Sequence, residues 1–268
     1  MAWKRPRAGG YDVYQQAEEI NMGFWGQDRK PDSRHNIWLE HLNIETGNWL
    51  QVFSACLGKM VAIQTACGEQ VVKGQDWNVD FSEGVILFGE QSYPLQFIGS
   101  ESTSSDTWLW GWENINGFPE EIIQLATNAK VVGERWNLEP LKTAEFSLDD
   151  IFNGHNLSIV TCGLVDKYCY YRGPHSGGAI FVAFSGVPDS VFASVDVQRF
   201  VSITMHYVQQ FTIDHKIFVE GFLTWNNTKY EWDANTLLAH FQQDLKIEFE
   251  QVNDVWRICA MDTILSGQ

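Results

Sequence analysis

Between Asn48 and about Lys73, the apolar positions follow the period of an α-helix. Apolar side chains recur there every three or four residues, which gathers them on one face of a helix. These side chains are Trp49, Val52, Phe53, Cys56, Met60, Ile63 and Cys67. We therefore predict a long amphipathic helix with one buried face.

After this helix the pattern changes to that of short strands. Runs rich in aromatic and β-branched residues are separated by segments that carry turn-forming residues. The runs are DWNVDF (76–81), GVILF (84–88), PLQFIGSES (94–102) and TWLWGWEN (107–114). They predict four antiparallel strands.

A second helix is predicted to begin at Pro119. Proline is favoured at the first position of a helix, and the carboxylates of Glu120 and Glu121 suit the positive end of the helix dipole. The residues at helical spacing that define its buried face are Ile122, Leu125, Ala129, Val132 and Trp136.

A third helix is predicted to begin at Ser147, because SLDD has the pattern of a capping box, although Gly154 and Gly163 weaken this helix. Two strand-like runs follow it, KYCYYR over 167–172 and AIFVAF over 179–184. The sequence GPHSGG joins the two runs, which predicts a hairpin.

The last third of the chain repeats the opening scheme of a helix followed by strands. A helical stripe comprises Val197, Phe200, Val201, Thr204, Val208 and Phe211. The strand-like runs after it are KYEWDAN, TLLAHF, LKIEFEQV and VWRICAM. An ancient duplication of a helix plus four strands explains the repetition, but alternation within strands can also imitate a repeat.

This order of elements predicts an α+β fold in which antiparallel β-sheets, arranged as two helix-plus-meander blocks, pack against amphipathic helices. Residues 1–45 are irregular but rich in aromatic side chains, so we expect an arm that packs on the body. Residues 46–190 form the first α+β region. Residues 191–268 form a helix and four-strand block of the same globule.

Part of this first region resembles a known family. The segments that carry the resemblance are GQDWNVDF, FIGSESTSSDTWLWGWEN, FPEEII, YRGP and AIFVAF. They are similar to an uncharacterised bacterial family, a domain of unknown function with W-x-V-D and T-W-L-W-x-W-x-N strand motifs. The resemblance covers roughly residues 48–190. It implies a recurring bacterial domain and brings no activity, cofactor or catalytic residue.

The charge balance narrows the range of partners. The chain has 18 Lys and Arg residues against 34 Asp and Glu residues, a formal net charge of −16. Such a surface repels phosphate backbones and anionic membranes, which argues against nucleic-acid and membrane partners. It would attract a basic protein, although acidity can also serve only to keep a protein soluble.

The N-terminal segment and the cysteines indicate a cytoplasmic protein. Lys4, Arg5 and Arg7 are not followed by an apolar run, so this segment is not typical of a secretory signal. The five cysteines are odd in number, and on one helix Cys56 and Cys67 would stand about 16 Å apart, beyond disulfide reach. We interpret the cysteines as small buried apolar residues.

Three tryptophans are the first candidates for a binding site. Alternation along a strand would place Trp108, Trp110 and Trp112 on one face. If that face meets a helix, the indoles belong to the core. If it meets a cavity, they form a stacking platform for a flat or sugar-like ligand.

Three polar residues are further candidates. Asp80 lies in the first predicted strand, and either it faces solvent or it forms a carboxylate pair with Asp76 or Glu113. Arg172 and His175 lie in a glycine-rich turn whose N–H groups could cradle an anion, with Arg172 as its counter-charge. The alternative is a plain hairpin in which Arg172 pairs with a carboxylate.

No sequence pattern for a catalytic triad, a metal site or a nucleotide-binding loop is present, so we expect no cofactor. The leading hypothesis is a non-catalytic binding or interaction protein, such as an acidic partner of a basic bacterial protein. The alternative is a small-molecule enzyme or ligand carrier with a pocket between the helices and the Trp-rich sheet. The oligomeric state stays open.

Overall fold

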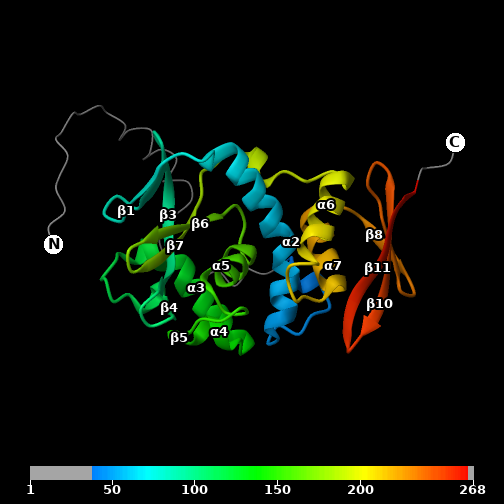
Figure 1. Ribbon diagram of the computed structural model, residues 1–268, viewed down its shortest axis with the longest axis horizontal. Coiled ribbons are helices and arrows are strands. Elements are labelled where there is room, and N and C mark those ends of the chain that lie inside the picture. Colours follow the sequence, from blue (N-terminus) through cyan, green and yellow to red (C-terminus); the bar gives the residue numbers. More distant parts are fainter. Residues whose placement is uncertain (1–37, 265–268) are drawn as a thin grey trace. The chain divides into compact units, whose positions relative to one another are not determined.

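The computed structural model of the protein describes residues 38–264 (Figure 1). The arm predicted over residues 1–45 therefore lies outside the described residues up to position 37. The helices are α2 (Trp49–Cys67), α3 (Glu120–Trp136), α4 (Glu139–Lys142), α5 (Gly154–Gly163), α6 (Val197–Tyr207) and α7 (His215–Trp225). The first seven strands are β1 (Trp77–Asp80), β2 (Val85–Phe88), β3 (Gln91–Ser102), β4 (Thr107–Trp110), β5 (Glu145–Ser147), β6 (Cys169–His175) and β7 (Gly178–Phe184). The last four are β8 (Tyr230–Asp233), β9 (Thr236–Ala239), β10 (Asp244–Val252) and β11 (Val255–Ile264).

These elements confirm the predicted α+β class. The first seven strands form one sheet and the last four form a second, and all the strand pairs are antiparallel. In Figure 1, α2 lies between α5 and α7. Both blocks contain four consecutive antiparallel strands, β1–β4 and β8–β11, as the predicted meanders require.

Helix α2 is the central helix of the fold. Asn48 caps it by accepting a hydrogen bond from the Gln51 N–H, and a single π-helical turn extends it to Val72. Every residue from Val52 to Ile63 is buried, so the prediction of one buried face was wrong. The reason is that α5 and α7 both pack on α2.

The same helix is long and apolar enough to cross a membrane. With its π-turn it spans Trp49–Val72, and 72% of its most apolar window is buried inside the fold. A core helix of a globular protein passes the same test of length and composition, so this is weak evidence for a membrane span.

Glycines allow α2 and α7 to approach closely. A Cβ atom on Gly221 would stand 2.4 Å from the Ala55 carbonyl oxygen, and one on Gly58 would stand 2.6 Å from the Phe222 Cβ atom. Both distances are shorter than any normal contact. The two backbones can therefore meet at this crossing only because neither glycine has a side chain.

Strand β3 organises the seven-stranded sheet. Its first residues pair with β2, and its last residues pair with β4 on one side and with β7 on the other. The four strands predicted between residues 76 and 114 are confirmed, with one difference. Trp112 is not in β4, because the chain turns into a 3-10 turn at Gly111–Glu113.

Helix α3 begins where it was predicted. Pro119 is its N-cap rather than its first helical residue, and Glu120 and Glu121 lie in the first turn. The predicted positions Ile122, Leu125, Ala129 and Val132 are buried, whereas Trp136 is half-buried. The helix packs on β3.

The helix predicted from Ser147 begins seven residues later, at Gly154. Ser147 is the last residue of β5, and Asp149 then accepts hydrogen bonds from the N–H groups of Ile151 and Phe152 at 2.7 and 2.6 Å. A short acidic side chain that bonds to nearby backbone in this way favours a turn over a helix. Asn153 provides the actual cap of α5.

Helix α7 was not predicted. The stripe expected over residues 197–211 ends at Tyr207 as α6, and a second helix follows it after Asp214, whose side chain caps α7. Buried residues lie on several sides of α7, because α2 and β11 both pack on it. A helix enclosed in this way lacks the clear polar face that makes a stripe visible.

The start of α7 covers the outer edge of β11. The Asp214 carboxylate accepts a hydrogen bond from the Trp256 N–H at 3.3 Å, and the His215 Nδ1 accepts one from the Ile258 N–H at 3.1 Å. The Arg257 side chain donates to the Ile213 carbonyl. Three successive residues before and within α7 thus hold three successive residues of an edge strand.

Candidate functional site

Trp108 and Trp110 are core residues. Their side chains are 0% and 1% exposed, and their rings meet edge to face with centroids 5.3 Å apart. Trp108 also contacts Phe181 on β7, and the Trp110 indole N–H donates to the Pro140 carbonyl at 2.9 Å. Neither ring presents a face to a ligand in this structure.

Trp112 stands apart from the other two indoles. It lies in the 3-10 turn after β4, and its half-buried ring is covered by Lys130 of α3, whose Nζ atom is 4.1 Å from the ring centroid. This is a cation–π contact between a helix and a turn. The predicted row of three indoles is therefore reduced to a buried pair and one lysine-covered ring.

Asp80 makes local contacts in the turn after β1. One carboxylate oxygen accepts hydrogen bonds from the Ser82 N–H, the Ser82 hydroxyl and the Glu83 N–H. The hydroxyl of Ser82, with help from these N–H groups, lowers the pKa of Asp80 below its usual value. These bonds are those of a tight turn, and they do not involve the other predicted site residues.

Arg172 and His175 lie on β6. The Arg172 Nε atom is 3.5 Å from a carboxylate oxygen of Glu101 on β3, and the other oxygen of Glu101 accepts from the Gly154 N–H at the start of α5. His175 Nδ1 accepts a hydrogen bond from the Gly177 N–H at 3.1 Å. In this arrangement the arginine pairs with a carboxylate, and a turn N–H group points to the histidine.

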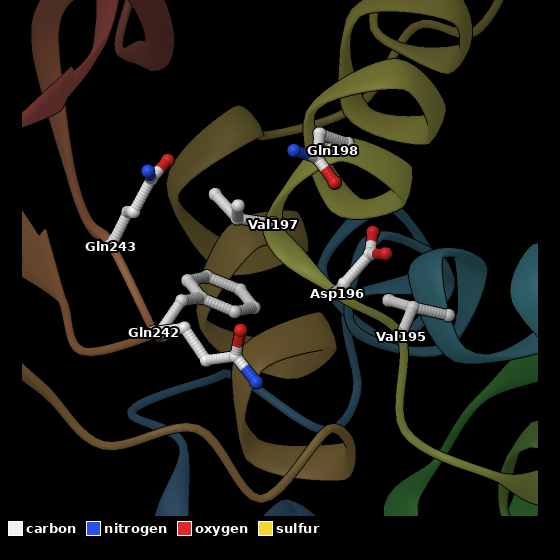
Figure 2. A pocket seen from close by; sticks show the side chains of 7 residues that line it. Val195, Asp196, Val197, Gln198, Gln242 and Gln243 are labelled. Atoms are coloured by element: carbon white, nitrogen blue, oxygen red, sulfur yellow. The ribbon is translucent and has the colours of Figure 1, made fainter.

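The groove in Figure 2 involves none of these residues. It has a volume of about 510 Å³ and lies between the first turn of α6 and the loop that joins β9 to β10. Its lining residues are Val195, Asp196, Val197, Gln198, Phe241, Gln242 and Gln243. In Figure 2, Gln198 and Gln243 lie on opposite sides of Val197.

The groove is held in shape by contacts beneath it. The buried side-chain amide of Asn226 accepts from the Val195 N–H at 2.6 Å and donates to the Val195 carbonyl at 3.0 Å. Phe241 packs against Phe200 of α6, with ring centroids 5.3 Å apart. The wall that contains Val195 is thereby fixed to the end of α7, and the wall that contains Phe241 is fixed to α6.

The chemistry of the groove is that of hydrogen bonding rather than of proton transfer. Three glutamine amides each offer two donors and an acceptor. Asp196 caps α6 through one carboxylate oxygen, which accepts from the Arg199 N–H at 2.8 Å. Over residues 38–264, no group of three or more His, Cys, Asp or Glu residues is arranged to hold a metal ion.

Sequence reasoning did not find this groove. Residues 195–198 and 241–243 are separated by two elements, α7 and the β8–β9 hairpin. The only sequence signal is a pair of adjacent glutamines between two strand-like runs. Such a pair is also typical of an ordinary loop, so the signal identifies nothing by itself.

A model of a family of unknown function matches residues 50–187, just over half of the chain. The protein belongs to DUF6882. This match bears out the resemblance to a domain of unknown function. The DUF6882 region runs from α2 to the residues after β7, so the groove lies beyond it. No curated protein and no solved structure gives a significant match to the chain.

Proposed function

We propose that this DUF6882 protein is a non-catalytic, cytoplasmic binding protein that holds an extended, basic segment of a bacterial partner protein. The observation that carries the proposal is the groove between α6 and the β9–β10 loop, with its rim of glutamine amides and one carboxylate. Its volume of about 510 Å³ falls in the range of roughly 300 to 1,000 Å³ that is usual for ligand sites.

The rim groups suit a peptide backbone. An extended peptide has unpaired N–H and C=O groups along both sides, and a glutamine amide can serve either kind. Gln198 lies on one wall, and Gln242 and Gln243 lie on the other, so a segment that runs along the groove meets amides on both sides. Val197 and Phe241 provide apolar surface between them.

The charge of the body favours a basic segment. Residues 1–37 contain six of the 18 Lys and Arg residues and five of the 34 Asp and Glu residues. Residues 38–268 therefore have 12 basic against 29 acidic residues, a formal net charge of −17. A strongly negative body raises the rate at which a basic partner arrives. Asp196 offers a local carboxylate at the groove itself.

Fluorescence anisotropy with labelled peptides tests the charge preference. We expect a decapeptide of alternating Lys and Val to bind about tenfold more tightly at low salt than one of alternating Glu and Val, with the difference shrinking as salt is added. Equal binding of the two peptides would sink the proposal.

Two aspartates distinguish the groove from the overall charge. Asp196→Asn keeps a good N-cap for α6 but removes the carboxylate charge, so we expect about threefold weaker binding of the basic peptide. Asp254→Asn, in the exposed β10–β11 turn, is the matched control and should leave binding nearly unchanged. If the two substitutions weaken binding equally, peptide binding depends on the net charge of the protein and not on the groove.

Two glutamine substitutions test the amides at the rim of the groove without changing the charge of the protein. We expect Gln243→Ala to weaken peptide binding by about threefold, since one hydrogen bond to the backbone is lost. Gln209→Ala, after the other end of α6 and exposed, should have no effect. If both variants bind like the wild type, the glutamines are not contacts and the proposed site is wrong.

A further inference from the structure

A second, smaller pocket lies between helices and the seven-stranded sheet. Its volume is about 160 Å³, and it opens among α2, α5, β6 and the C-terminal end of α6. The lining residues are Leu57, Met60, Val61, Gln64, His155, Ile159, Tyr170, Tyr207 and Phe211. All but Tyr207 and Phe211 lie within the DUF6882 match.

The polar groups of this pocket are few and fixed. His155 Nδ1 lies 3.3 Å from the Tyr170 hydroxyl. The Gln64 side chain donates to the Tyr170 carbonyl at 2.8 Å and accepts from the Tyr170 N–H at 3.0 Å, which fixes the strand to α2. The His155 ring also packs edge to face on Phe181. One imidazole and one phenol thus form a polar corner in a pocket whose other lining residues are apolar except for Gln64 and Tyr207.

This polar corner is uncharged at neutral pH. Burial lowers the pKa of His155, and the nearby Arg172 lowers it further, against the opposite effect of Glu101. Burial also raises the pKa of Tyr170. A neutral imidazole and a neutral phenol can bind a neutral polar group, whereas a charged ligand would lose its hydration among apolar side chains.

We infer that this pocket binds a small, neutral, single-ring aromatic compound that carries one hydroxyl group. The pocket is open to solvent on the side of His155, and its volume of about 160 Å³ is large enough for one ring, since an apolar cavity of about 150 Å³ takes up benzene. A hydroxyl both donates and accepts, so it can join the His155–Tyr170 pair whichever of the two is the donor.

This site is separate from the proposed peptide groove. The groove lies at the first turn of α6, and the pocket uses Tyr207 and Phe211 at and beyond its last turn. The two share no residue, so the failure of one proposal leaves the other intact.

Titration of the wild-type protein with p-cresol and toluene tests the inference, with the Met60 methyl signal followed by NMR. Both compounds should shift this signal, p-cresol with a dissociation constant of about 1 mM or tighter and about fivefold tighter than toluene. Toluene lacks only the hydroxyl. No shift at Met60 at millimolar p-cresol, or equal affinity for the two compounds, would refute the inference.

A pair of tyrosine variants tests the polar corner. Tyr170→Phe removes one oxygen and keeps the ring, so p-cresol should bind it as weakly as toluene, while toluene binding stays unchanged. Tyr171→Phe is the matched control, because its side chain points to the other face of β6 and should leave both affinities unchanged. If Tyr170→Phe binds p-cresol like the wild type, the hydroxyl recognition is wrong. The wild-type comparison above stands even if a variant folds poorly.

Discussion

At the scale of single residues, Lys59 is notable because it is a lysine buried in the core. Its side chain is only 2% exposed, yet its Nζ atom donates to the carbonyls of Gly163 and Val165 at 3.0 and 2.6 Å. Those carbonyls lie at and just after the end of α5, where a helix has unsatisfied acceptors and a partial negative charge. The buried amine therefore acts as a C-terminal cap supplied by another helix.

Replacing Lys59 by Met should lower the free energy of unfolding by about 2 kcal/mol, because one buried and one part-buried carbonyl lose their donor. Urea unfolding followed by circular dichroism measures this change. Lys229→Met, at an exposed position before β8, should change stability by less than about 0.5 kcal/mol. A Lys59→Met protein as stable as the wild type would show that these carbonyls need no cap.

Sequence patterns at this scale say which residues are apolar, but not which polar side chains are buried. The stripe on α2 includes Cys56 and Met60, and nothing in it indicates that Lys59 between them is also enclosed. Its partners lie more than a hundred positions away. Only the packing of α5 on α2 brings them together.

At the scale of elements, most runs with a clear local pattern were predictable, including the enclosed helix α2, whereas α7 and the start of α5 were not. Strands β1, β2, β4, β8 and β9 fall within the predicted runs, because alternation and turn residues define them locally. Strands β3, β10 and β11 extend beyond their predicted runs by one to three residues. Helix α7 was missed because it is covered on more than one side. The start of α5 was misplaced because the carboxylate of Asp149 forms a turn in place of a cap.

The crossing of α2 and α7 should tolerate no added methyl group. Gly221→Ala would bring a Cβ atom to 2.4 Å from the Ala55 carbonyl oxygen, so we expect a loss of about 2 kcal/mol or more. Gly68→Ala is the matched control. It has helical backbone angles and nothing within 4 Å of its added methyl, so it should stabilise the protein by roughly 0.5 to 1 kcal/mol. Thermal unfolding of both variants measures these changes in stability. A Gly221→Ala protein as stable as the wild type would contradict the close crossing of α2 and α7.

The contact between α7 and β11 should make stability depend on pH. Burial lowers the pKa of His215 from its usual 6.5 to about 4, with Arg257 adding to the effect. The folded state therefore binds this proton less readily than the unfolded chain does. The stabilisation is complete above about pH 6.5 and is lost as the pH falls toward 4.

Urea unfolding at pH 7 and pH 4.5 checks this dependence. Between these values the wild type should lose on the order of 2 kcal/mol more than His215→Gln, whose side chain does not titrate. His206→Gln, exposed on α6, is the control and should follow the wild type. Parallel losses in wild type and His215→Gln would show that the imidazole is not the group responsible.

At the scale of the whole molecule, fold class and family region could be predicted, but the cavities could not. The groove depends on the meeting of residues 195–198 with 241–243, and the small pocket needs α2, α5, β6 and α6 together. The predicted Trp108, Trp110 and Trp112 were chosen for their chemistry, and that same apolar chemistry places the first two in the core. The composition predicted that the protein is acidic, but it could not predict the groove in which a partner would bind.

Strand β11 is the outermost strand of its sheet, and the beginning of a helix, not another strand, occupies its open side. This contact depends on pH, because a charged imidazole cannot accept the hydrogen bond from the Ile258 N–H. An exposed edge strand of this kind can pair with strands of other molecules. Concentrated solutions are therefore expected to turn cloudy as the pH falls toward 4, through pairing of chains at β11, while most of the fold is still intact.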